Sequence, residues 1–127
     1  MKGSFINALT GTGYYRVSKI LISNLGLLKA FALTDLIDKF EFYRERGQLV
    51  EDKWFFYRRE DIEKVWGVQS HHQREILNDF VKRGLLQYEK KGPMPKKNYY
   101  TINIAELEKY FEKLIYIEQK GEYNSES

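Results

Sequence analysis

The chain has 127 residues and a formal net charge of +3, and 43% of its residues are hydrophobic. This length predicts one domain with a core of its own. Aromatic residues make up 16% of the chain, too many for a disordered protein. The absence of cysteine excludes disulfides, thiolate metal sites, iron–sulfur clusters and a cysteine nucleophile. We expect a cytoplasmic protein, because no apolar run reaches the roughly 20 residues that span a bilayer and no signal-peptide pattern is seen.

The charge is unevenly distributed along the chain. Residues 104–127 contain three lysines and six glutamates, a net charge of −3, so residues 1–103 carry a net charge of +6. A basic body with an acidic C-terminal segment suits a polyanionic partner. An unevenly charged, solvated surface gives the same pattern.

The first third of the chain predicts a flexible leader and one strong helix. Glycines and small side chains in residues 1–13 indicate a loosely held arm. We expect a short extended segment at 14–18 and an apolar turn at 19–25. A helix is predicted between Gly26 and Gly47, where apolar residues recur with the spacing of one buried helical face. These residues are Leu33, Leu36, Ile37 and Phe40.

The middle of the chain predicts a strand and two helices. Residues 54–57 (WFFY) favour a short buried strand, because aromatic side chains are enriched in strands. A short helix is predicted at 58–66. Ser70 and Gln73 have the spacing of a capping box that opens a second helix, which ends at Gly84. The apolar face of this helix is predicted to contain Ile76, Leu77, Phe80 and Val81.

The last third predicts a hairpin and a long helix. Residues 85–90 and 98–102 are predicted strands that flank KGPMP, a sequence typical of a hairpin tip. Asn103 is placed to cap a final helix at about 104–119, and a polar tail that frays is expected at 120–127. The apolar stripe of this helix is Leu107, Tyr110, Phe111, Leu114 and Ile115.

In chain order, these elements predict a winged helix-turn-helix. Two helices joined by a glycine turn form a helix-turn-helix at about 58–83, and the hairpin at about 85–102 forms the wing. The predicted fold class is therefore α+β, mainly α, with a β-hairpin wing and a long C-terminal helix. The domain is expected to span residues 14–119.

Several stretches resemble a family of replication proteins. They are residues 55–64 (FFYRREDIEK), 67–68 (GV), 73–74 (QR), Leu77, 83–86 (RGLL), 92–103 (GPMPKKNYYTIN) and 25–42. Over roughly residues 14–115 the chain resembles the winged-helix N-terminal domains of phage replisome organisers and DnaD-like proteins. The resemblance implies DNA binding in phage or mobile-element replication. Two departures are that such proteins usually continue into a second domain, and that Arg58 and Arg59 replace an expected Ser or Thr cap.

The second helix of a helix-turn-helix enters the major groove with its N-terminal residues foremost. Here Arg74 is suited to a guanine and Asn78 to an adenine, and Ser70 is suited to a phosphate through its backbone N–H. Glu75 and Asp79 flank this face and would repel phosphates, although Glu75 is also able to accept from a cytosine. An ordinary solvated helix face is the alternative interpretation.

The hairpin tip carries the strongest electrostatic signal. Two prolines stiffen it, and four lysines surround it. Such a tip suits DNA phosphates or a minor groove, although lysines at hairpin tips also keep strands from pairing edge to edge. The complete set of expected DNA-binding residues is Arg58, Arg59, Gln69, Ser70, His71, His72, Arg74, Asn78, Lys82, Lys90, Lys91, Lys96 and Lys97.

Other chemistry is not predicted. No catalytic motif has a supporting context, so we expect neither an enzyme nor a cofactor. Adjacent helical residues point about 100° apart, so His71 and His72 are not expected to share a metal ion. Tyr99 and Tyr100 are able to stack on single-stranded bases, but places in the core or at an interface are preferred.

The last helix carries more apolar side chains than a small core requires, which favours a homodimer. Its expected interface is Tyr110, Leu114, Tyr116 and Ile117. The leading hypothesis is a sequence-recognising protein that binds double-stranded DNA in phage or mobile-element replication initiation or transcriptional regulation, with a replication or regulatory protein as a further partner. The alternative is a winged helix that binds proteins, as an adaptor or as an inhibitor of a host complex. The acidic last helix, Glu75 and Asp79 favour that alternative.

Overall fold

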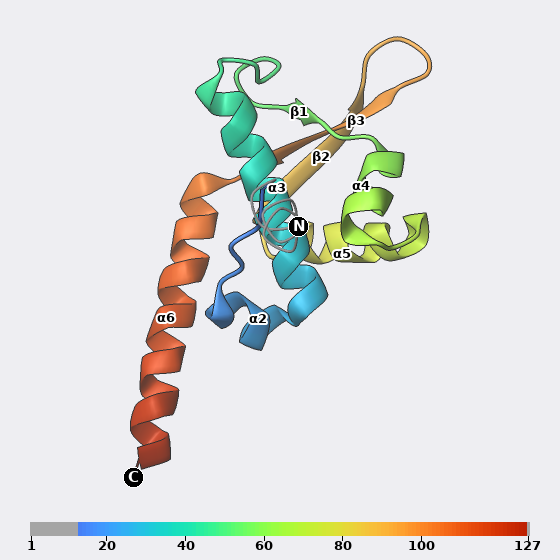
Figure 1. Ribbon diagram of the computed structural model, residues 1–127. Coiled ribbons are helices and arrows are strands. Elements are labelled where there is room, and N and C mark those ends of the chain that lie inside the picture. The colour runs from blue at the N-terminus through green and yellow to red at the C-terminus, as the bar shows by residue number, and fades with distance from the viewer. Residues whose placement is uncertain (1–12, 127) are drawn as a thin grey trace, which may run out of the picture.

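The computed structural model describes residues 13–126, with side chains described for residues 13–120. Apart from Gly13, the predicted leader lies outside these residues. Five helices and three strands occur in the described part (Figure 1). They are α2 (Lys19–Leu25), α3 (Leu27–Glu45), β1 (Phe55–Phe56), α4 (Arg59–Trp66), α5 (Ser70–Lys82), β2 (Leu86–Lys91), β3 (Lys97–Ile102) and α6 (Ile104–Glu126).

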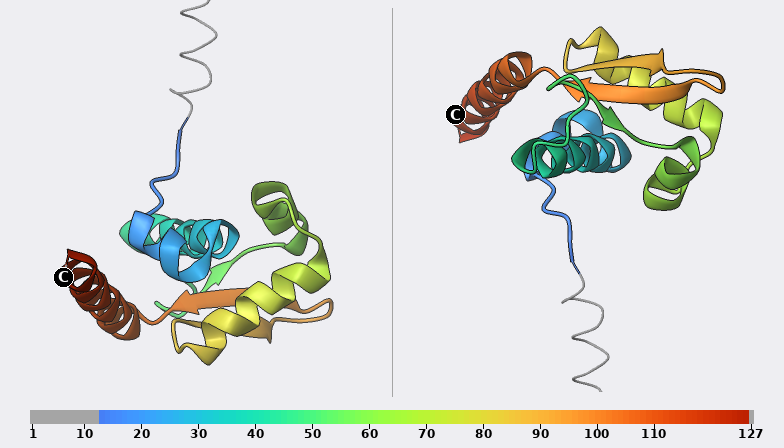
Figure 2. Two further views of the ribbon diagram at one scale, coloured as in Figure 1. Left: turned by 90° about the horizontal axis from the view of Figure 1, so that it is seen from below. Right: turned by 90° about the horizontal axis from the view of Figure 1, so that it is seen from above.

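The three strands form one antiparallel sheet in the order β1-β3-β2. Tyr100 in β3 lies at its centre, paired with Phe55 on one side and Tyr88 on the other. α3 packs against β1 and β3, and α5 packs against β2 (Figure 2). This α+β, mainly helical arrangement is a winged-helix-like fold with a C-terminal helix, as the sequence predicted.

The core is filled by the apolar faces of α3, α4 and α5 together with the aromatic residues of the sheet. The predicted face of α3 is confirmed at its centre, because Leu33, Leu36 and Phe40 are buried, while Ile37 is half-buried. In α5, Val81 was predicted to lie on the buried face, but it is 40% exposed. Gln73, which was not part of the predicted buried face, is buried.

A fully buried carboxylate, Asp35, connects α3 to three other parts of the chain. Its Oδ2 accepts hydrogen bonds from the Tyr57 hydroxyl at 2.6 Å and from the Trp66 indole nitrogen at 2.9 Å. Its Oδ1 accepts from the Tyr15 hydroxyl at 2.9 Å and lies 3.9 Å from the Lys39 ammonium. Since Tyr57 follows β1 and Trp66 ends α4, these bonds set the position of α4 against α3.

Three local predictions were wrong. Residues 19–25 form a helix and not a turn, because Ser18 caps it and Gly26, at φ 85°, ends it. Ser70 and Gln73 do not form a capping box: Gln69 is the N-cap of α5, and its side chain makes no capping hydrogen bond. α6 continues past residue 119 to Glu126.

The start of α6 agrees with its prediction, because the Asn103 side chain accepts a hydrogen bond from the Glu106 backbone N–H at 3.1 Å. α6 packs against α2 and then runs away from the rest of the fold (Figure 1). Over the described residues, no helix has the length and apolar character required to cross a membrane.

Candidate nucleic-acid interface

The buried side chain of Gln73 fixes the turn between α4 and α5. Gly67 ends α4 in the left-handed conformation, and only residues 67–69 separate the two helices. The Gln73 amide nitrogen donates to the Val68 carbonyl at 2.9 Å and to the Arg59 carbonyl at 3.3 Å. One side chain therefore holds the first turn of α5 against both the turn and the start of α4.

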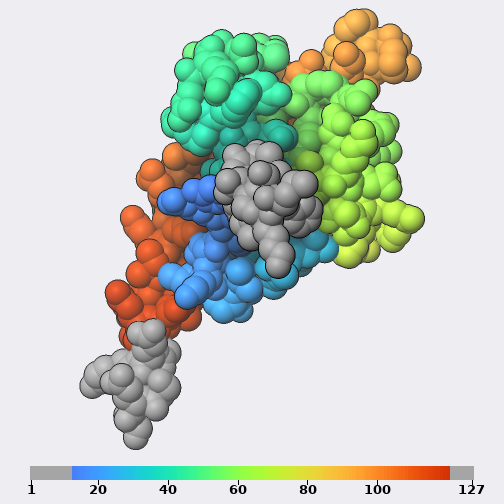
Figure 3. Space-filling view, viewed as in Figure 1, coloured from blue at the N-terminus to red at the C-terminus, as the bar shows by residue number. Residues whose placement is uncertain are grey.

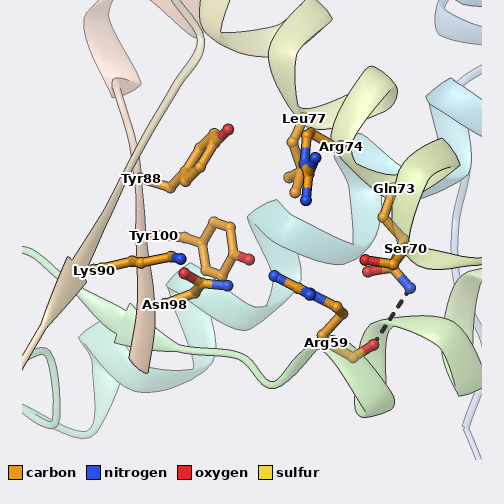
Figure 4. Close-up of a pocket in the computed structure, with 9 residues that line it drawn as sticks. All are labelled: Arg59, Ser70, Gln73, Arg74, Leu77, Tyr88, Lys90, Asn98 and Tyr100. Carbon is orange, nitrogen blue, oxygen red and sulfur yellow. Dashed lines mark hydrogen bonds between the residues drawn. The ribbon is translucent and has the colours of Figure 1, made fainter. Parts of the chain in front are cut away.

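A groove with a volume of about 220 Å³ lies between α5 and the two long strands, and Arg59 closes one end of it (Figure 4). Its walls combine basic, amide and aromatic side chains. The lining residues are Arg59, Ser70, Gln73, Arg74, Leu77, Tyr88, Lys90, Asn98 and Tyr100.

Three cations converge on this groove without counter-ions. The side chains of Arg59, Arg74 and Lys90 come from α4, α5 and β2 and point into the same space (Figure 4). None of the three forms an ion pair with any other described residue. Because like charges repel, this arrangement favours an anion in the groove.

Asp79 was expected to repel phosphates from α5. Its negative charge is instead balanced by two cations outside the groove. Its carboxylate lies 2.9 Å from the Arg83 guanidinium and 3.6 Å from the Lys29 ammonium on α3. Hydrogen bonding to Arg83, together with the two positive charges, holds the pKa of Asp79 below its usual range despite the opposing effect of burial. Asp79 therefore stays ionised, and its charge is neutralised beside α3. Glu75 remains exposed on α5.

Two tyrosines complete the floor of the groove. Burial raises the pKa of Tyr100 to about 12, although nearby Arg59 acts in the opposite direction, so its hydroxyl is neutral at physiological pH. The Tyr88 hydroxyl donates to Asn78 Oδ1 at 2.8 Å and so ties β2 to α5. This bond occupies the acceptor that Asn78 would need for the predicted bidentate pairing with adenine.

The four lysines of the hairpin were expected to form one cluster, but they do not. Neighbouring strand residues face opposite sides of the sheet, so the lysines are divided between its two faces. Lys90 shares a face with Tyr88 and lines the groove. Lys91 lies on the other face, with its ammonium 4.7 Å from the Trp54 ring centre and 3.5 Å from Glu51. The Lys97 ammonium lies 5.2 Å from the ring centre of Phe56, and Lys96 is exposed in the turn.

The other predicted DNA-binding residues are dispersed. Arg58 does not line the groove of its neighbour Arg59, because its guanidinium pairs with Asp61 at 3.1 Å. His71 and His72 are exposed, with ring centres 6.4 Å apart, and Lys82 and Gln69 are also exposed. Among the described side chains, no group of three or more His, Cys, Asp or Glu residues is arranged to hold a metal ion.

Five lining residues were not predicted as part of the site. Gln73 was assigned to a cap and Leu77 to the core. Tyr100 was considered for stacking on single-stranded bases, but a place in the core or at an interface was preferred, and Tyr88 and Asn98 were given no role in DNA binding. Alternation along the two strands was the missed signal. In the observed register, Tyr88 pairs with Tyr100 and Lys90 with Asn98, which places all four on one face.

The predicted dimer residues on α6 differ in accessibility. Leu114 was predicted to contact a second copy, but it is only 4% exposed and belongs to the core, so it is not available for that contact. Tyr110 is half-buried, with its ring centre 5.9 Å from the Arg83 guanidinium. Tyr116 and Ile117 are 58% and 47% exposed, and Ile115 is exposed beside them.

Comparison with known proteins shows the fold. No family model matches the sequence, and no curated protein matches it. A solved structure of a Rep–DNA complex is similar, with a TM-score of 0.58 and 18% identity over 77% of this chain and 80% of the other. An N-terminal domain of a DNA-binding protein has a TM-score of 0.57 and 18% identity, over 77% of this chain and 79% of its own. At this identity, the comparison establishes a shared fold with both structures.

Proposed function

We propose that this chain binds double-stranded DNA, with α5 in the major groove and the wing against the flanking backbone. The observation that carries the proposal is the convergence of Arg59, Arg74 and Lys90 on one groove without paired carboxylates. Phosphate contacts from such side chains supply most of the affinity of DNA-binding proteins and release counterions. The three cations come from three elements that Gln73 and the sheet hold together, so they are organised before DNA arrives.

The fold supports a biological role in replication. One structural neighbour is a complex of a Rep protein with DNA, and the sequence itself resembles phage replication proteins. We therefore favour a role in replication initiation of a phage or mobile element. As a separate part of the proposal, the chain acts in the cytoplasm and is not an enzyme. Transcriptional regulation uses the same docking geometry and is the closest alternative role.

Recognition of sequence falls mainly to Arg74 in this proposal. It is exposed near the N-terminal end of α5, and a guanidinium forks onto the edge of a guanine. Asn78 contributes only if DNA displaces the Tyr88 hydroxyl from its oxygen. The exposed apolar residues of α6 support a symmetric dimer, which would present two copies of α5 to a two-fold related site.

A second candidate is protein binding without DNA. Glu75 is exposed on α5, and residues 104–127 carry a net charge of −3. These acidic groups favour a basic protein partner such as a host complex or another replication or regulatory protein. The neutralisation of Asp79 by Lys29 and Arg83 removes one of the observations that supported this candidate.

Fluorescence anisotropy with a random-sequence duplex tests the proposal. At about 0.1 M salt, loss of one phosphate contact weakens binding by about 8-fold, so Lys90→Glu is expected to cost at least that factor. Lys113→Glu is the matched control, because Lys113 is exposed on α6, has no ion pair among the described residues and changes the net charge equally. Negligible duplex binding at low salt, or equal losses in both variants, would count against the proposal and favour the protein-binding candidate.

A further inference from the structure

A second groove lies on the other side of the junction between β1 and α4. It has a volume of about 430 Å³ and is formed by α3, the end of β1 and α4. Figure 3 looks onto the face of the molecule where α3 and α4 lie side by side. The lining of this second groove includes three basic and three aromatic residues, namely Lys39, Arg58, Lys64, Tyr43, Phe56 and Tyr57.

Two of the three aromatic rings of this groove are partly accessible, whereas Tyr57 is buried. Phe56 and Tyr43 are half-buried, so each is packed on one side and meets solvent on another. Phe56 is supported by Tyr99, with ring centres 5.6 Å apart, and Tyr43 is stacked on Phe55 at 6.3 Å. Rings that are held in place in this way lose little freedom when a further flat group stacks on them.

The groove is also positively charged. Its lining carries three cations against one carboxylate, Asp61, and the Lys97 ammonium lies 5.2 Å from the ring centre of Phe56. Lys39 is turned toward buried Asp35, and Arg58 is paired with Asp61. Lys64 is exposed and has no ion pair within the described residues, which leaves its charge available to a ligand.

We propose that this second groove binds single-stranded DNA. Fixed aromatic rings beside unpaired cations are the combination that holds single strands without sequence preference, because every base has a face that stacks and every nucleotide carries a phosphate. Bases would stack on Tyr43 and on Phe56, where a base would take the place of the Lys97 ammonium over the ring. Phosphates would meet Lys64 and the displaced Lys97. A duplex does not fit this arrangement, since its bases are already stacked and paired.

The position of the groove relates it to the first one. Arg58 and Arg59 are consecutive at the start of α4, and each lines a different groove. A strand that leaves a duplex held by α5 would meet the second groove directly across these two residues. The inference goes beyond the proposed duplex binding and does not depend on it, because it uses different side chains.

Anisotropy with an oligothymidylate of about 12 nucleotides tests the inference beside the duplex. At about 0.1 M salt, Lys64→Glu is expected to weaken single-strand binding by about 5-fold or more, since one contact on single strands contributes a slope of about 0.7. Phe56→Leu keeps an apolar side chain but removes the ring, and its expected loss is about 5- to 150-fold. Duplex affinity is expected to change less than about 2-fold in both variants, and Lys113→Glu to change neither affinity beyond that margin.

The outcomes separate the two proposals. If the oligothymidylate does not bind, or if Lys90→Glu weakens it while Lys64→Glu does not, the second groove is not a single-strand site. Duplex binding is then still tested separately, by comparing Lys90→Glu with Lys113→Glu. If single-strand binding follows Lys64 and Phe56 while duplex binding is absent, the inference stands and the proposed function fails. If a thermal melt shows that Phe56→Leu is unfolded, Lys64→Glu decides alone.

Discussion

Replacement of the buried carboxylate Asp35 is expected to destabilise the fold by an amount that depends on the substituting group. In Asp35→Ala, the Tyr57 hydroxyl and the Trp66 indole N–H lose their acceptor. Each buried donor left without a partner costs about 1–3 kcal/mol, so we expect a loss of about 4 kcal/mol. This loss is a large fraction of the roughly 5–15 kcal/mol that stabilises a small domain.

Asp35→Asn is expected to cost less, about 2 kcal/mol. The amide oxygen is able to keep both bonds from Tyr57 and Trp66, but a neutral acceptor contributes about 1 kcal/mol less per bond than a charged one. The amide nitrogen would face Tyr15, whose hydroxyl is also able to accept. Relief of the charge-burial cost offsets the lost attraction of Lys39.

Urea unfolding followed by tryptophan fluorescence measures these differences. Asp38→Asn is the control, since Asp38 is an exposed carboxylate on the same helix, and its substitution is expected to change stability by about 0.5 kcal/mol or less. Equal losses in Asp35→Ala and Asp35→Asn would refute the hydrogen-bond reasoning. An Asp35→Asn variant as stable as the parent would show that the carboxylate charge contributes nothing.

Three further predictions concern pH, specificity and assembly. Burial raises the pKa values of Tyr57 and Tyr100, so their stabilisation is complete below the unfolded pKa of about 10 and is lost as pH rises above it, by about 1.4 kcal/mol per pH unit for each residue. Tyr100→Phe should therefore flatten the alkaline fall of the urea midpoint, and an unchanged slope would contradict the assignment. Arg74→Ala is expected to remove about 1–3 kcal/mol of discrimination between selected and random duplexes, whereas equal weakening on both would leave it a phosphate contact only. Tyr116→Lys is expected to convert a dimer to a monomer in sedimentation velocity, and a monomeric parent chain would exclude the α6 dimer.

Most of the secondary structure was predictable because local signals agree with the fold. In α3 the helical spacing of Leu33, Leu36 and Phe40 is matched by burial, and Gly67 and Gly84 follow the ends of α4 and α5. α2 was missed because seven residues are too few for a periodic pattern, although Ser18 was available as its cap.

The candidate site was predictable only in part, because it depends on contacts between distant residues. Arg59, Ser70, Arg74 and Lys90 were expected to bind DNA, and the fold does bring them to one groove. The split among the hairpin lysines depends on strand alternation, which a count of charges does not consider. The role of Asp35 was not predictable, because it lies among apolar residues of a helix and its hydrogen-bond donors are 20, 22 and 31 residues away along the chain.

The salt dependence of duplex binding in Arg58→Ala and Arg59→Ala tests the central claim most directly. These neighbours have the same side chain, but only Arg59 lines the groove beside α5, while Arg58 pairs with Asp61. The plot of log Kd against log salt concentration is expected to lose about 0.9 of its slope in Arg59→Ala and to stay unchanged in Arg58→Ala. Equal slopes in the parent chain and Arg59→Ala would contradict duplex binding by this groove.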